Sequence, residues 1–202
     1  MKPIKGYANA KAYTEAERLP VGGYVVKIMN VEYIDNSSKG YSDTIVLSFD
    51  IVEGEYKDYF TQNYRSQQGE DKKWKGTYRV RIPKDDGSEQ DGWAQRRFKT
   101  DITAFEESNK GYHWDWQEQG LKGKLVGVVF NNKEWGMETA NGYQTGWFTN
   151  AHHLLSAEAV RNGKYKIPAD QPKKDKPSES QQGSNNWMDI PDGVNDDALP
   201  FN

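Results

Sequence analysis

The stretch at residues 44–52 reads TIVLSFDIV, and it decides the fold. Apolar Ile45, Leu47, Phe49 and Ile51 occupy every second position, while the positions between them are more polar. Successive side chains of a β-strand point to opposite faces of the sheet, so this alternation predicts a strand buried on one face. The rest of the domain is expected to form a sheet around this strand.

Two further β-like runs flank this stretch. Residues 24–34 precede it, and the intervening DNSSKG at residues 35–40 is a cluster of turn-forming residues, so we predict a β-hairpin. After Gly54, residues 56–64 read YKDYFTQNY, a composition rich in aromatic side chains that suit a pleated surface. The three runs together predict a three-stranded antiparallel meander.

A helix is expected after the meander. Residues 88–91, SEQD, approximate a capping box, in which a Ser side chain satisfies free backbone N–H groups at a helix start. Apolar Ala94, Phe98, Ile102 and Phe105 then recur at helical spacing. This single apolar stripe predicts a helix that covers the core and ends near residue 109.

The β-pattern returns at residues 123–130, where Gly127 indicates a bulge or a close backbone approach, and again at residues 143–148. A short helix is expected at residues 156–161. The predicted order is three strands, a helix and two strands in a mainly β protein. The OB-fold, a five-stranded barrel with a helix between strands three and four, has this order and binds oligomers through one face.

Composition sets further bounds. The 202 residues suffice for one domain and an appendage, and the absence of cysteine excludes disulfides, thiolate zinc sites and cysteine nucleophiles. No apolar run has the length of a signal peptide or a membrane span, so we expect a cytoplasmic protein. The net charge is −3, and the acidic excess lies beyond Pro168. Any affinity for nucleic acid must therefore come from a local basic groove.

Such a groove is predicted in and just before residues 65–81, where basic and aromatic side chains interleave. Single-stranded nucleic acid is bound by cations along its phosphates and by rings on which bases stack. Packing of Trp74 and Tyr78 on the sheet, with solvated lysines, is an equally good interpretation of this segment alone. The candidate contacts are Tyr59, Tyr64, Arg65, Lys72, Lys73, Trp74, Lys75, Tyr78, Arg79 and Arg81.

The composition changes after Pro168 to Pro, Lys, Ser, Gln, Asn and Gly, which bury too little apolar surface to fold. We therefore divide the chain into a binding domain at residues 1–168, a disordered linker at residues 169–186 and an acidic tip at residues 187–202. The tip mixes acidic and apolar residues, which favours a peptide that docks on a partner protein.

Residues 196–201, DDALPF, resemble the acidic tip of bacterial single-stranded DNA-binding proteins, although here Asn202 follows Phe201. The resemblance implies that the tip recruits replication, recombination and repair proteins, and that the phenylalanine enters a basic-rimmed pocket. The residues that would contact such partners are Asp196, Asp197, Leu199, Pro200 and Phe201.

The body is similar to single-stranded DNA-binding proteins of the phage or prophage type. The similar pieces are residues 19–28, 107–114, 121–128 and 163–168. This resemblance implies a protein that coats single-stranded DNA largely independently of sequence in the cytoplasm of a bacterial host cell. The sequence leaves open whether the chain forms a homo-oligomer and whether it prefers DNA to RNA.

The sequence gives less support to a metalloprotein, an enzyme or a carbohydrate-binding module. Adjacent His152 and His153 are expected on opposite faces of a strand, which suits shared metal ligation poorly. No phosphate-binding glycine loop, nucleophile elbow or carboxylate cluster appears, so we expect neither an enzyme nor a metal or other cofactor. The alternative is a carbohydrate-binding β-module, because seven tryptophans and twelve tyrosines could also stack on sugars.

Overall fold

The computed structural model describes residues 18–140 and 142–173. Five strands and three α-helices follow one another, together with two short 3₁₀ helices. In chain order they are β1 (Gly22–Ile34), η2 (Ser37–Lys39), β2 (Thr44–Ile51), α1 (Tyr59–Ser66), β3 (Thr77–Arg81), α2 (Glu89–Ser108), η3 (Glu118–Leu121), β4 (Leu125–Thr139), β5 (Gly142–Leu155) and α3 (Ala157–Arg161). None of the helices in the described ranges combines the length and apolar character needed to cross a membrane.

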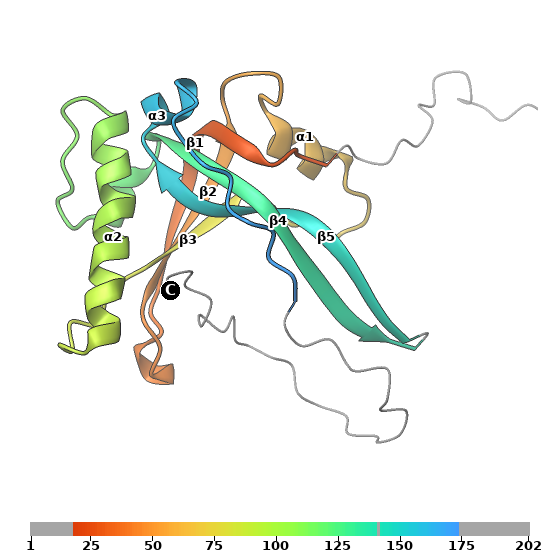
Figure 1. Ribbon diagram of the computed structural model, residues 1–202, viewed down its shortest axis with the longest axis horizontal. Coiled ribbons are helices and arrows are strands. Elements are labelled where there is room, and N and C mark those ends of the chain that lie inside the picture. Colours follow the sequence, from red (N-terminus) through yellow and green to blue (C-terminus); the bar gives the residue numbers. More distant parts are fainter. Residues whose placement is uncertain (1–17, 141, 174–202) are drawn as a thin grey trace, which may run out of the picture.

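The five strands form one antiparallel sheet in the order β3-β2-β1-β4-β5 (Figure 1). The predicted mainly β class is confirmed, and α2 lies between the third and fourth strands as expected. The predicted closed barrel is not confirmed, because β3 and β5 are the two ends of the sheet order. No strand ladder joins them within the described residues.

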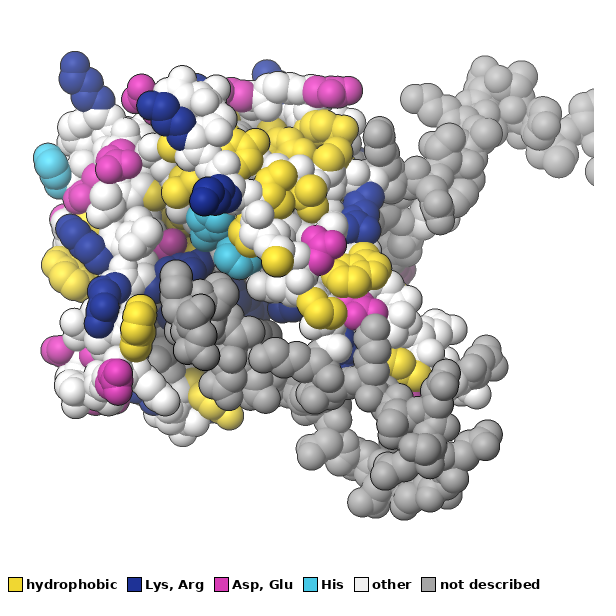
Figure 2. Space-filling model, in the orientation of Figure 1, with side chains coloured by type: hydrophobic (Ala, Val, Ile, Leu, Met, Phe, Trp, Pro, Cys, Tyr) yellow, Lys and Arg dark blue, Asp and Glu magenta, His cyan; other side chains and the backbone are white. Residues whose placement is uncertain are grey.

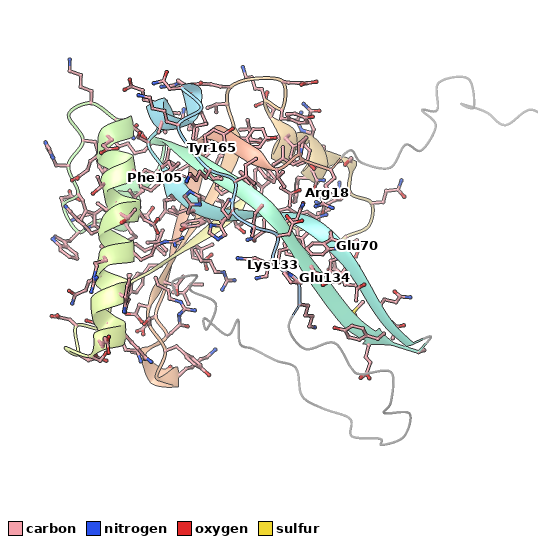
Figure 3. All side chains as sticks on the ribbon, viewed as in Figure 1. Arg18, Glu70, Phe105, Lys133, Glu134 and Tyr165 are labelled. Atoms are coloured by element: carbon pink, nitrogen blue, oxygen red, sulfur yellow. The ribbon has the colours of Figure 1, made fainter. Side chains whose placement is uncertain are left out.

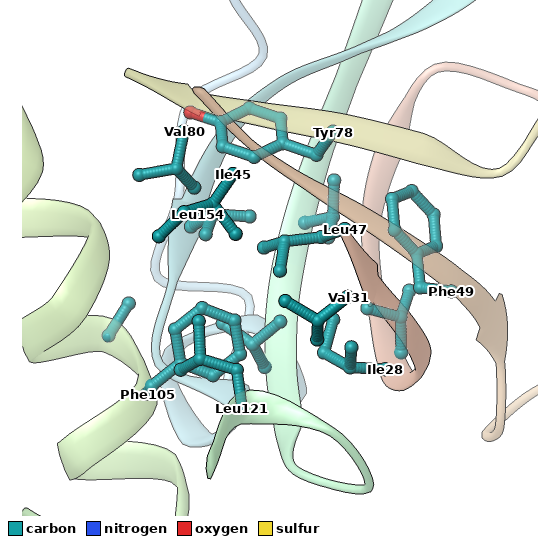
Figure 4. Close-up of a cluster of buried hydrophobic side chains, with 14 of the residues drawn as sticks. Ile28, Val31, Ile45, Leu47, Phe49, Tyr78, Val80, Phe105, Leu121 and Leu154 are labelled. Atoms are coloured by element: carbon teal, nitrogen blue, oxygen red, sulfur yellow. The ribbon is translucent and has the colours of Figure 1, made fainter. Parts of the chain in front are cut away.

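The hairpin of β1 and β2 is confirmed, and it forms the centre of the core. Ile45, Leu47, Phe49 and Ile51 are all buried, as the alternation predicted (Figure 4). The ladder between the two strands shifts register between Ile28 and Asn30, which leaves Met29 as an extra residue in β1. Such a bulge bends its strand and redirects the side chains beside it.

The third strand predicted at residues 56–64 is wrong, because this segment forms α1 instead. The buried carboxylate of Asp50 accepts backbone N–H groups from Ile51 and Phe60 at 2.9 Å and from Thr61 at 3.0 Å. A helix start has free N–H groups and favours negative charge, so this side chain from β2 holds the first turn of α1. The third strand of the sheet is β3, which begins thirteen residues after residue 64.

The predicted helix is confirmed as α2, which covers the core at one end of the sheet (Figure 1). Its N-cap Ser88 accepts the N–H of Asp91 at 3.1 Å, as a capping box requires. Phe98, Ile102 and Phe105 are buried, and Phe105 lies beside the buried side chains of the sheet (Figure 4). The short helix predicted at residues 156–161 is also present, as α3 with Ser156 as its N-cap.

The last two strands are much longer than predicted. Only residues 125–130 of β4 pair with β1, and from there β4 and β5 continue as a two-stranded arm that projects from the sheet (Figure 1). Arg18 reaches the root of this arm, where its Nε donates to the hydroxyl of Thr149 at 3.1 Å (Figure 3). Lys133 and Glu134 lie on β4 close to the same root (Figure 3).

The boundary predicted between the domain and a disordered linker at residue 169 is too early. Gln171 lies along β4, where its N–H donates to the carbonyl of Asn132 at 2.8 Å and its carbonyl accepts from Glu134 at 2.9 Å. The N–H of Lys173 donates to the Glu134 carboxylate at 3.1 Å. Residues 169–173 therefore belong to the folded unit, and the rest of the predicted linker and tip lies outside the described residues.

Where a barrel would close, a side-chain network from α2 bridges the two end strands. Arg97 donates to the Tyr78 hydroxyl of β3 at 2.8 Å and to the His152 carbonyl of β5 at 3.0 Å. The Tyr78 hydroxyl also lies 3.2 Å from the buried Asp101 carboxylate. A bulge in the β4–β5 ladder at this point brings the Nδ1 atoms of His152 and His153 within 3.0 Å, so the prediction of opposite faces is wrong.

This network predicts a pH dependence of stability. Burial raises the pKa of the Asp101 carboxyl to about 6, although the charge of Arg97 partly offsets this effect. An acid whose pKa is raised by folding stabilises the protein below its unfolded pKa, and this contribution is lost as pH rises through the folded pKa. The stability of the natural chain relative to Asp101→Asn should therefore fall by roughly 3 kcal/mol between about pH 4 and about pH 7.

The control is His153→Gln, for which the sign is opposite. Burial, followed by the nearby His152 and Arg97, lowers the pKa of His153 to about 4. Its contribution is present above its ordinary pKa of about 6.5 and is lost as pH falls toward 4. Urea unfolding of the three proteins over this pH range measures both effects. Parallel curves for the natural chain and Asp101→Asn would contradict the assignment.

Candidate nucleic-acid interface

A groove of about 420 Å³ opens on the outer face of β1 and β2, opposite the core. Its floor is formed by the two strands, and its wall is formed by α1 and the segment that leads from α1 into β3. Three of the predicted contact residues meet here although they are spread along the chain. The lining residues are Met29, Asn30, Ser48, Tyr64, Lys72 and Trp74.

The floor of the groove is created by the bulge in β1. In a regular strand only one of two successive residues faces outward, but Met29 and Asn30 are both exposed here. Asn30 lies directly opposite Ser48 of β2 in the ladder. The floor thus combines a flexible apolar side chain with an amide and a hydroxyl, and it carries no charge of its own.

Trp74 forms a fixed wall. Its Nε1 lies 3.2 Å from the Phe49 carbonyl oxygen and 3.0 Å from the Gly76 carbonyl oxygen, so the indole is anchored to β2. Gly76 is essential to this approach, because a Cβ there would lie 2.7 Å from the ring of buried Phe60. The remaining surface of the half-buried indole faces the groove. One ring therefore serves both the core and the surface.

Tyr64 lies beside Trp74 and is the more accessible of the two rings, with 38% of its surface exposed. The two ring centroids are 5.9 Å apart at an angle of 47°. The ammonium of Lys72 lies 5.9 Å from the centroid of the Tyr64 ring, within the range of a weak cation–π contact. The groove therefore presents adjacent ring surfaces and a cation at one edge.

The basic segment after α1 is held in place by Gln67. Its amide accepts the N–H of Lys73 and donates to the carbonyl of the same residue, both at 2.9 Å, and it also bonds Asn63 at 3.1 Å. These bonds fix the backbone at Lys73 against the last turn of α1. Lys72, Lys73 and Lys75 are exposed on this constrained segment. Because the backbone is already held, less conformational entropy is lost when these lysines bind an anion.

Two more predicted cations extend the basic surface along β3. Arg79 lies opposite Val46 and Arg81 opposite Thr44, so both project from the outer face of the sheet. Partial burial lowers the pKa of Arg81 from its ordinary value, which still leaves the guanidinium charged near neutral pH. Exposed Glu32 of β1 also lies opposite Val46, on the side of β2 that is away from β3. This face of the sheet therefore carries both signs of charge, with a basic excess along β3.

Two of the predicted ring contacts, Tyr59 and Tyr78, pack against other parts of the fold. Tyr78 faces the core with only 7% of its surface exposed, and burial raises the pKa of its hydroxyl, which bonds Arg97 and Asp101. Tyr59 packs edge-on against Phe60, with ring centroids 5.2 Å apart, and its hydroxyl accepts the N–H of Leu19 at 3.0 Å. Tyr78 is therefore not accessible for stacking and that prediction is wrong, whereas the Tyr59 ring is half-buried and is held by contacts within the fold.

The other predicted residues divide into two groups. Arg65 lies exposed in the last turn of α1, on the element that carries Tyr64. The predicted partner-binding residues at 196–201 lie outside the described residues. Sequence reasoning missed Met29, Asn30 and Ser48, because nothing in the alternation of β1 indicates the bulge that turns two successive residues outward.

Within the described ranges, no group of three or more His, Asp or Glu side chains is arranged to hold a metal ion. No protein-family model matches the chain, and no curated protein sequence shows significant similarity to it. The groove and its surroundings are therefore the features that bear on function.

Proposed function

We propose that this chain is a single-stranded DNA-binding protein, and not an enzyme, which coats DNA largely independently of sequence. One observation carries the proposal: the accessible Tyr64 and Trp74 rings meet the Lys72 ammonium in a groove on the outer face of the sheet. Bases stack on such rings with roughly 1–3 kcal/mol each, and cations follow the phosphates. Every base has a π-face, so this form of binding tolerates sequence.

We further propose that the sheet is an OB-fold left open between β3 and β5, where Arg97 takes the place of a strand ladder. The order of the elements and the position of α2 support this assignment. OB-folds bind single strands across one face of the sheet and the loops around it. The groove and the Arg79–Arg81 surface would then form one continuous track across β1, β2 and β3.

The experiment that tests the function is a titration with poly(dT) followed by tryptophan fluorescence at several salt concentrations. Stacking should quench the fluorescence, and the affinity should fall steeply with salt because each neutralised phosphate releases condensed counterions. A flat salt response, or equal affinity for duplex DNA, would reject the proposal.

We propose that the acidic tip recruits replication, recombination and repair proteins in the cytoplasm of a bacterial host. The support is the DDALPF sequence at residues 196–201, in which acidic residues precede an apolar end.

Phe201→Ala should leave DNA affinity unchanged and remove the captured proteins, because the ring is the apolar anchor of the tip. Pull-downs from a bacterial lysate with the natural chain, with Phe201→Ala and with residues 189–202 removed test this. Identical sets of captured proteins in all three would contradict a recruiting role.

Tyr64 separates binding from folding better than Trp74, whose indole also anchors the core. Tyr64→Ala should weaken poly(dT) binding by about 1–3 kcal/mol with little change in the thermal midpoint. A matched control is Trp93→Ala, because this ring is 43% exposed and has a cation, Arg96, 4.5 Å from its centroid. Equal losses of affinity in the two variants would show that the groove has no special role.

The lysines of the constrained segment should determine part of the salt dependence. Lys72→Gln combined with Lys73→Gln should reduce the slope of log affinity against log salt by about 1.4, if each lysine neutralises one phosphate. Lys99→Gln combined with Lys110→Gln is the control, because both residues are exposed and lie on or just after α2, outside the lining of the groove. An unchanged slope in the first pair would remove this segment from the phosphate track.

A further inference from the structure

Among the described residues, no other strand pairs with the outer edge of the arm. β5 runs for fourteen residues, and β4 is the only strand that pairs with it in the part of the chain that the structure describes. Near its end the His152 carbonyl accepts from Arg97 and the Thr149 hydroxyl donates to the Leu19 carbonyl, so residues 144–148 are the part of the edge that no other described strand pairs with. A strand edge with unpaired N–H and C=O groups is a template for pairing with another strand.

This edge lacks the features that normally prevent such pairing. Residues 142–155 read GYQTGWFTNAHHLL, with no Lys, Arg, Asp, Glu or Pro, in a chain of which 28% is charged. Burial lowers the pKa of both histidines, so they are neutral at neutral pH. At the opposite end of the sheet, β3 is only five residues long and carries Arg79 and Arg81. The contrast indicates an edge that is covered in the working protein.

The faces of the arm are also unusually apolar. Trp147 and Phe148 of β5 are 42% and 40% exposed, and Trp135 and Met137 of β4 are 39% and 55% exposed. Hydrophobic side chains lie on the side of the arm that faces the viewer in Figure 2. The Trp135 ring lies across Gly146, where a Cβ would approach its Nε1 to 2.7 Å. Trp135, Met137 and Phe148 share one face of the arm. Trp135 and Met137 are two residues apart on β4, and Phe148 is two residues from Gly146, the partner of Trp135 in the ladder.

We propose that β5 pairs edge to edge and antiparallel with β5 of a second copy of this chain. A two-fold axis perpendicular to the arm would place the same uncharged edge on both sides, so the surface is its own complement. The apolar faces that contain Trp135 and Phe148 would then continue from one copy into the other. Backbone bonds would satisfy the edge, and ring contacts across the axis would bury the exposed aromatic surface.

A second copy fits this edge better than nucleic acid or an acidic peptide. Both of those ligands require cations, and β5 provides none along its fourteen residues. An uncharged edge that meets an identical uncharged edge has no such requirement. The inference concerns the arm alone and does not depend on DNA binding, since the groove lies on β1 and β2.

Sedimentation equilibrium of the full chain without DNA, over a dilution series, tests the proposal. The natural chain should show the mass of two copies at high concentration, and Gln144→Lys with Thr145→Lys should show the mass of one, because like charges would face each other across the axis. Ser38→Lys with Gln90→Lys adds the same charge at exposed positions outside β5 and should remain dimeric.

The absence of cysteine from the natural chain permits an independent measurement. Thr145→Cys should form a disulfide-linked dimer under mild oxidation, whereas Ser38→Cys should not, and this test remains valid if the lysine variant fails to fold. A natural chain that is monomeric throughout the dilution series would overturn the proposal. A dimer that persists in the folded lysine variant, with no crosslink at residue 145, would also overturn it.

Discussion

The Asp50 carboxylate is the interaction on which the candidate site depends. It extends from β2 and accepts three backbone N–H groups, two of them from the first turn of α1. A buried carboxylate without such donors would be costly, and a helix start without an acceptor would leave its N–H groups unsatisfied. Each therefore requires the other, and the position of α1 on the sheet is fixed. Tyr64 and the constrained basic segment follow from that position.

Three local irregularities build the groove on an otherwise regular sheet. The helix α1 provides one wall, and the bulge in β1 turns Met29 and Asn30 outward. The missing side chain at Gly76 lets the chain approach closely enough for Trp74 to bond β2. A β-sheet with an ordinary interior thus acquires a surface site through its exceptions to strand geometry.

Sequence reasoning succeeded where burial alone determines structure and failed where a distant side chain does. Alternation located the buried face of β2, and the capping pattern located α2, because both signals are local. The aromatic residues 56–64 satisfied a strand pattern equally well, and the contact with Asp50, distant in sequence, holds the start of α1 within this segment. Tyr78 fits a binding pattern in sequence, yet β3 is paired so that this ring faces inward. Gly127 was correctly expected to mark a close approach, since a Cβ there would meet Val160 of α3.

The central claim is that single-stranded DNA occupies the groove between the β1–β2 face and the segment after α1. Amide hydrogen exchange of the full chain, with and without saturating oligothymidylate, tests this claim most directly because it locates the contact without any substitution. The account predicts slower exchange in residues 64–76 and around the bulge at Met29, with little change along the exposed side of α2. Protection confined to α2, or no protection at saturation, would contradict it.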